Sequence, residues 1–205
     1  MRPITALSST WTILALLAWA PAASAMRFQE RPTWMVGVGW GFGRGFFDDA
    51  ELGEHVYRSG SAPQIHFGWK PSTRFMVGTH YEAWMIELGE VPIKIRRSLQ
   101  NLSLGLTWYP GNPVGPSGGI YLRAGGGLGW AGTAEVPVEE EEAQTHGKRI
   151  DEWGVSVFGD AGYEFWISGN ATISAGLSLN YLDIGESIVD AGLFAGGLLG
   201  LTLYF

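Results

Sequence analysis

The last fifteen residues constrain the fold of this chain most strongly. Residues 191–205 read AGLFAGGLLGLTLYF and contain no charged side chain. Taken in steps of two back from Phe205, one face is almost wholly apolar, which is the period of a β-strand. A tilted strand crosses a bilayer with about 9–11 residues, whereas a helix needs about 20. The segment is too short and too glycine-rich for a spanning helix, so it predicts a membrane-spanning strand.

The same alternation recurs seven times upstream, which predicts eight strands in all. Their connections alternate in length along the chain. Longer loops are expected at 44–60, 88–92, 134–151 and 183–190, and turns at 71–73, 110–118 and 168–170. An even strand number places both chain termini on one side of the barrel. Short turns on that side and longer loops on the opposite side are the pattern of bacterial outer-membrane barrels. The predicted fold is all-β, an eight-stranded antiparallel up-and-down transmembrane barrel that follows a cleavable signal peptide.

The volume of the side chains predicts which face points outward. In every expected strand one face is bulky and apolar, and the other is rich in the 31 glycines of the chain. The interior of an eight-stranded barrel is filled by roughly a dozen side chains, by comparison with other small barrels. The bulky face carries far more than that. We therefore expect it to face lipid, and a secreted barrel with an apolar interior is the less favoured alternative.

Aromatic residues of the bulky face gather at the two ends of the strands, as in the interfacial girdles of membrane barrels. The predicted girdle residues are Trp69, Phe75, Trp108, Phe165 and Phe205 at the turn ends, and Trp40, Tyr81, Trp130, Trp153 and Tyr181 at the loop ends. Phe205 is therefore expected to anchor the closed barrel as well as to end the chain.

The glycine-rich face carries few ionisable residues, and a buried charge needs a partner. The predicted polar network of the lumen consists of Lys70, His66, His80, Glu82, Arg123, Asp160 and Glu164. We expect Arg123 to lie near Glu164, with Asp160 further toward the loops. The network is interpreted as a structural plug, and a narrow or gated polar path is the alternative.

His80 and Glu82 stand two residues apart on that face, a geometry suited to general-base work or to half of a metal site. A lipid A-modifying acyl-chain enzyme is therefore kept as a remote alternative. An inward His80 could not reach an acyl chain in the leaflet, so we expect no enzyme activity, no catalytic residue, no cofactor and no metal.

The loops expected at 44–60 and 134–151 are acidic, and the second contains Glu139, Glu140, Glu141 and Glu142. A charge run of this kind is interpreted as a solvated loop. The functional alternative is a loose divalent-cation site bridging to lipopolysaccharide phosphates, or contact with a basic partner.

Residues 1–25 have the features of a secretory signal: Arg2, the apolar run WTILALLAWA and the cleavage motif Ala23-Ser24-Ala25. Residues 26–205 are then expected to form one barrel domain. The chain has no cysteine, which excludes disulfides and thiol chemistry. Its net charge of −7 argues against nucleic-acid binding.

The segments LGLTWYP, GIYLRAGGGLGW, DAGYEFWISGNATISAGLSLNYL and the terminal LGLTLYF resemble those of the eight-stranded bacterial outer-membrane β-barrel family, which includes the OmpA N-terminal domain, OmpX and OmpW-like proteins. The resemblance implies export to the outer membrane and insertion by its barrel assembly machinery through the C-terminal strand. It also implies contact with lipid and lipopolysaccharide, and a monomer. It implies a structural or surface-interaction role, or as an alternative a narrow channel or transporter of small hydrophobic molecules. The peptidoglycan-binding domain of OmpA-type proteins is not expected.

Overall fold

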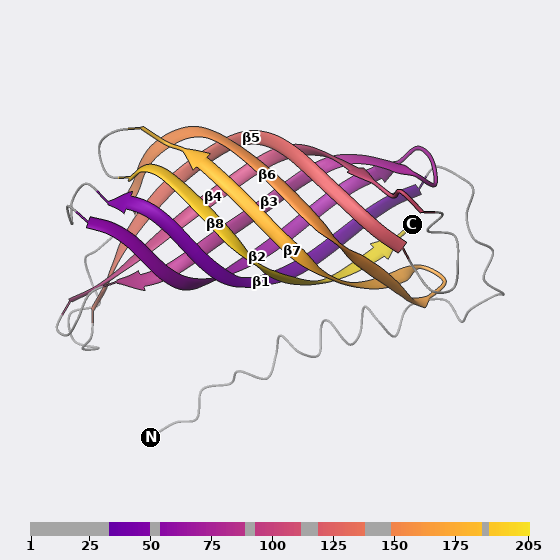
Figure 1. The fold of residues 1–205 in the computed structure, drawn as a ribbon, viewed down its shortest axis with the longest axis horizontal. Helices are drawn as coiled ribbons and strands as arrows, with labels where there is room; N and C mark the ends of the chain where they lie inside the picture. The colour runs from indigo at the N-terminus through magenta and orange to yellow at the C-terminus, as the bar shows by residue number, and fades with distance from the viewer. Residues whose placement is uncertain (1–32, 50–53, 89–92, 112–118, 138–148, 186–188) are drawn as a thin grey trace, which may run out of the picture.

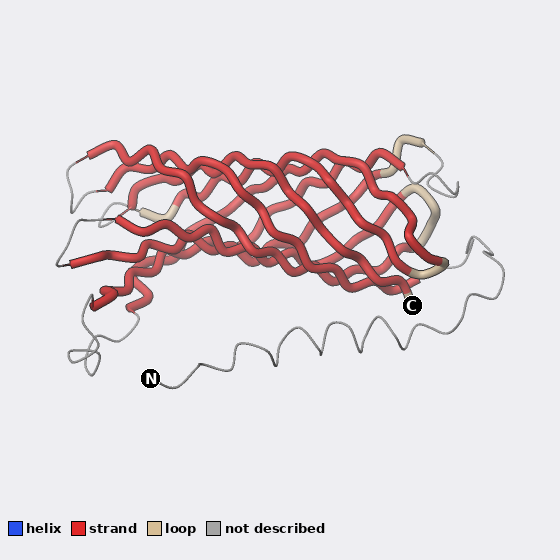
Figure 2. The backbone as a smooth tube through the Cα atoms, turned by 90° about the horizontal axis from the view of Figure 1, so that it is seen from below, coloured by secondary structure: helices blue, strands red, loops and turns tan. Residues whose placement is uncertain are grey.

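The computed structural model describes residues 33–49, 54–88, 93–111, 119–137, 149–185 and 189–205. The expected signal peptide lies outside these ranges. Strands account for nearly all of the described backbone (Figure 2). No helix in the described ranges is long and apolar enough to span a membrane.

Eight antiparallel strands, each hydrogen-bonded to its neighbour in the chain, form a closed barrel (Figure 1). The strands are β1 (Thr33–Asp49), β2 (Glu54–Lys70), β3 (Phe75–Leu88), β4 (Ile93–Trp108), β5 (Gly119–Pro137), β6 (Arg149–Ser168), β7 (Ala171–Asp183) and β8 (Val189–Tyr204). This confirms the predicted all-β, up-and-down architecture.

The barrel closes between its first and last strands. β1 pairs with β8 from Met35↔Tyr204 to Asp49↔Val189, and the backbone N–H of Phe205 donates to the carbonyl oxygen of Trp34 at 2.8 Å. The C-terminal strand is therefore paired along its whole length, which removes the sheet edge that an open barrel would expose.

The prediction of a long loop over residues 44–60 was wrong. β1 runs on to Asp49 and β2 starts at Glu54. The alternation continues on both strands, with Phe46 packed on Tyr57 at a ring-centroid distance of 4.5 Å. Strands of 13–20 residues exceed the roughly 9–11 that a tilted strand needs to cross a bilayer. Polar composition here marks the strand ends beyond the membrane rather than a loop. The 134–151 loop is shortened in the same way by β5 and β6.

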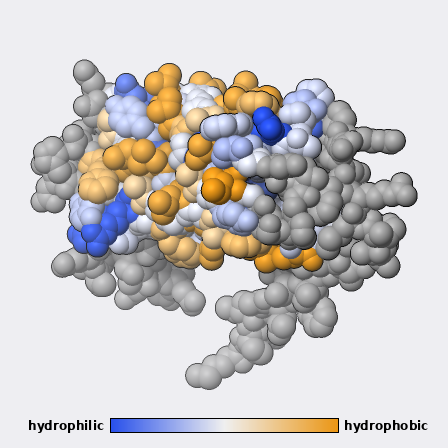
Figure 3. Space-filling view, turned by 45° about the vertical axis from the view of Figure 1, so that its right-hand side comes forward, coloured by the Kyte–Doolittle hydropathy of each residue, from blue (hydrophilic) through white to orange (hydrophobic). Residues whose placement is uncertain are grey.

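The two faces of the wall divide as predicted. Leu104, Val155 and Leu177 are among the large apolar side chains that point outward, each more than 60% exposed. Polar and aromatic side chains on the alternate positions are buried inside. In the space-filling view, apolar residues cover much of the wall between the two ends (Figure 3). An apolar surface of this extent on a closed barrel is stable against lipid rather than water.

Candidate functional site

The lumen has an apolar layer at the loop end of the barrel, which we call the cap. Trp84 is its centre, with Phe47 edge-on at a ring-centroid distance of 5.8 Å and Phe194 at 5.7 Å. The cap residues are Phe47, Ala62, Trp84, Ile86, Leu99, Ala131, Leu182, Ile184 and Phe194, all buried. The cap therefore packs together side chains from β1, β2, β3, β4, β5, β7 and β8.

A second layer, which we call the floor, lies at the turn end. It consists of Met35, Met76, Tyr109, Tyr121 and Tyr204, with Trp166 packed against it. The ammonium group of Lys70 lies 4.3 Å from the Tyr109 ring centroid. Lys70 thus belongs to the floor through a cation–π contact.

Between cap and floor, Arg123 forms an ion pair with Asp160 across the β5–β6 ladder, at an Nη1 to Oδ2 distance of 3.5 Å. Its Nε also donates to Thr107 Oγ1 at 3.2 Å. The expected order of the carboxylates was wrong, because Arg123 stands directly opposite Asp160 while Glu164 stands opposite Gly119. A short turn would fix which residues of β5 and β6 pair, but these two strands are separated by a long connection. Their register is therefore set by the barrel as a whole and could not be predicted from turn geometry.

Glu164 lies closer to the floor. The hydroxyls of Tyr109 and Tyr204 donate to its two carboxylate oxygens at 3.2 and 2.9 Å. The floor thus provides the hydrogen bonds that a buried carboxylate requires.

Nearer the cap, Glu82 accepts a hydrogen bond from Asn180 Nδ2 at 2.7 Å, and its Oε2 lies 3.3 Å from His80 Nε2. Asn101 Nδ2 donates to Asn180 Oδ1 at 3.0 Å. Three strands, β3, β4 and β7, are linked by this chain of side chains. His66 lies lower in the lumen, with Nε2 3.3 Å from Thr202 Oγ1.

The lumen has little room for chemistry. His80 and Glu82 are each 1% exposed, so a substrate has no described route to the pair, and a general base must reach the proton it removes. Within the described ranges no group of three or more His, Asp or Glu residues is arranged to hold a metal ion.

The girdle residues lie on the outer face of the wall. At the turn ends Trp69, Phe75, Trp108, Phe165 and Phe205 are exposed, and at the loop ends Trp40, Trp153 and Tyr181 are exposed. Tyr81 and Trp130 are half-buried because they pack on each other, with ring centroids 6.1 Å apart.

Sequence reasoning did not identify the cap. Its signal is a change along the inward face, from glycine and small polar residues to Trp84, Leu182 and Phe194 near the loop ends. The acidic run Glu139–Glu142 lies outside the described residues.

No protein-family model matches this chain, and no curated protein matches it. Solved structures do. Neisserial surface protein A (NspA) has a TM-score of 0.58 at 10% identity, over 84% of this chain and 97% of that chain. The attachment invasion locus protein Ail of Yersinia pestis, solved with the heparin analogue sucrose octasulfate, has a TM-score of 0.53 at 13% identity, over 84% and 99% of the two chains. The chain therefore has the fold of the eight-stranded β-barrels found in the bacterial outer membrane.

Proposed function

We propose that this protein is a closed, non-conducting outer-membrane barrel with a structural or surface-interaction role, and that it is not an enzyme. The observation that carries the proposal is the filled lumen. Cap and floor each pack side chains from several strands, and hydrogen bonds join polar side chains of different strands between them.

The exposed fractions support the closed state. Between cap and floor, Asp160, Arg123 and Asn180 expose only 4%, 7% and 2% of their surfaces. Ion conduction needs a continuous hydrated path or a ring of fixed ligands to replace water. The narrow-channel alternative would require the described cap to open. Under this proposal, the ionisable residues of the lumen hold the eight strands in register.

Single-channel recording in planar bilayers tests this proposal. The refolded barrel, added at a concentration where a conducting porin gives steady insertion events, is expected to give no conductance steps. Insertion is verified separately by protease protection of the reconstituted protein. Stepwise conductance from the wild-type barrel, with that protection present, would overturn the closed-lumen function.

The surface role belongs to the loop ends, which we propose contact a basic or cation-bridged partner. The chain has a net charge of −7. Asp48 and Asp49 end β1, and Glu54 begins β2 opposite Asp49. Ail was solved with a sulfated heparin analogue; a polyanion of that kind would be repelled by an acidic end. Binding of the reconstituted barrel to lysozyme, a basic protein, but not to heparin beads at low salt is the expected result.

Export and assembly are part of the same proposal. Residues 1–25 serve as a cleaved signal, the C-terminal strand is read by the barrel assembly machinery, and the product is a monomer. Outer-membrane fractionation, with slower gel migration after boiling than before, tests this.

A further inference from the structure

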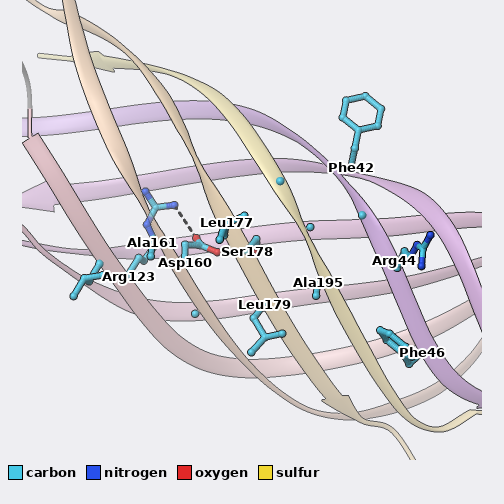
Figure 4. Close-up of a pocket in the computed structure, with 15 residues that line it drawn as sticks. Phe42, Arg44, Phe46, Arg123, Asp160, Ala161, Leu177, Ser178, Leu179 and Ala195 are labelled. Carbon is cyan, nitrogen blue, oxygen red and sulfur yellow. Dashed lines mark ion pairs between the residues drawn. The ribbon is translucent and has the colours of Figure 1, made fainter.

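A groove crosses the outer, lipid-facing wall over β8, β7 and β6, with a volume of about 870 Å³ (Figure 4). Three consecutive residues of each of these strands line it, so strand backbone forms much of the base of the groove. Phe42, Arg44 and Phe46 of β1 border one side, and Leu122 of β5 the other.

The groove follows from small residues on the outward face. On β8, Ala195 and Gly197 lie between larger neighbours, because Gly197 pairs with Phe42 on β1 and with Leu177 on β7. Gly159 repeats this on β6, opposite Leu179. A Cβ added to Gly197 would meet only a carbonyl oxygen, at 3.9 Å. These positions face open space, unlike the glycines of the lumen.

Arg44 borders this groove on the outward row of β1, opposite Ala195 of β8, and Phe46 lies two residues nearer the loop end. Arg44 lies ten residues beyond Trp34, an exposed tryptophan that stands opposite Trp69 of the turn-end girdle. Ten residues of a tilted strand span about 25 Å along the barrel axis. The apolar band of such barrels is about 25 Å tall. Arg44 is therefore at the level of the outer-leaflet headgroups, if the loop ends face outward as the proposed function has it.

Neighbouring aromatic residues hold the guanidinium group in place. Arg44 donates a hydrogen bond to the Tyr57 hydroxyl and lies 4.9 Å from the Tyr57 ring centroid. Tyr57 is in turn packed on Phe46. Among the side chains that the structure describes, which leave out residues 48–56 among others, no carboxylate forms an ion pair with Arg44.

We propose that the groove is the binding site of one phosphorylated glycolipid of the outer leaflet, of the lipid A class. One acyl chain lies over Ala195 and Gly197, and a phosphate is bound by Arg44. An arginine near the end of a membrane-spanning strand can reach the headgroup level, and a guanidinium matches phosphate with two parallel hydrogen bonds. The groove supplies apolar contact beyond what a convex wall offers to a chain. This inference rests on the outer-membrane placement in the proposed function.

Native mass spectrometry of the refolded barrel in detergent, titrated with bisphosphorylated lipid A, tests the site. The wild type is expected to bind one molecule. Arg44→Gln is expected to weaken binding about tenfold, the scale of one charge-assisted contact, and Arg44→Lys less. Gly197→Leu, which fills the groove, is also expected to weaken binding about tenfold. Arg74→Gln, an exposed arginine at the turn end, is the matched control and should bind within twofold of wild type.

Several outcomes overturn the site. Equal binding by wild type and Arg44→Gln, or equal binding of dephosphorylated lipid A, removes the phosphate contact. Unchanged lipid binding by Gly197→Leu would show that the acyl chain does not lie in the groove. If the mass spectra instead show a dimer of the wild type that Gly197→Leu abolishes, the groove is a contact between two copies of the chain. Heat-modifiability on gels confirms that each variant is folded. Failure of the closed-lumen function would be seen as conductance, with lipid binding unchanged.

Discussion

The imidazole of His80 stacks on the ring of Phe158 in the middle of the lumen, with ring centroids 4.4 Å apart and an angle of 15° between the ring planes. The two residues come from β3 and β6, so the stack bridges the barrel from one wall to the other. Phe158 has room because Gly105 is beside it: an added Cβ there would come within 2.9 Å of the ring. One aromatic pair therefore links the apolar and polar parts of the interior.

Replacing Phe158 with alanine is expected to lower the free energy of unfolding by about 3–5 kcal/mol, because it leaves a cavity that the rigid wall cannot close. Urea unfolding in lipid vesicles, followed by tryptophan fluorescence, measures this. The matched control is Val157→Ala, one residue away on the lipid-facing side and 55% exposed, for which less than about 1 kcal/mol is expected. Equal losses in the two variants would contradict the packed lumen.

The Arg123–Asp160 pair predicts a non-additive cycle. Arg123→Met leaves the Asp160 carboxylate, whose side chain is 0% exposed, buried without its cation, at a cost of about 3–5 kcal/mol. Adding Asp160→Leu removes the stranded charge and should recover most of that loss. The same urea titrations give all four corners of the cycle. Strict additivity would show that the two side chains do not interact, and an unchanged Arg123→Met would remove the structural role of the network.

The strands, and which face of each strand points into the lumen, could be predicted from the sequence, because alternation with period two is a local property. The partner of Arg123 could not. Register in a barrel depends on the shear of all eight strands together, and residues 138–148 between β5 and β6 are too many for turn geometry to set it. The cap was missed for a related reason. Trp84 and Phe194 are distant in sequence, and only closure of the barrel brings them together.

The glycine opposite the cap gives a sterically defined prediction. A Cβ at Gly45 would collide with the Trp84 ring, which is packed among cap residues and has no space to move. Gly45→Ala is expected to cost about 1–3 kcal/mol through overpacking, and to reduce the fraction that migrates as the folded band on unboiled gels. Gly159→Ala is the control, since its Cβ would meet only the Arg123 carbonyl oxygen, at 3.9 Å. A folded fraction that is the same for both would contradict the steric role of Gly45.

A buried polar contact on the outer face gives the last prediction. Gln100 points outward yet is only 5% exposed, and the Tyr81 hydroxyl donates to its Oε1 at 2.8 Å. Tyr81→Phe removes that donor in a setting where neither lipid nor water replaces it, so a loss of about 1–3 kcal/mol is expected in bilayers. Adding Gln100→Leu removes the amide oxygen that is left without a donor, and should restore most of the stability because replacing both partners by apolar groups is close to neutral. The part that is not restored corresponds to the hydrogen bond that Gln100 Nε2 donates to Ser98 Oγ at 3.0 Å, which this variant also removes.

Tyr181→Phe serves as the control for this prediction. It is an exposed tyrosine of the same loop-end girdle, and no hydrogen-bond partner for its hydroxyl lies in the described ranges. Its loss should stay below about 0.5 kcal/mol. If Tyr81→Phe and Tyr181→Phe cost the same, the stability at the loop-end girdle comes from ring contact with the interface alone. If only Tyr81→Phe lowers the free energy of unfolding, and Gln100→Leu restores most of it, the stability comes instead from the Tyr81–Gln100 hydrogen bond, which Tyr81 and Trp130 shield from lipid.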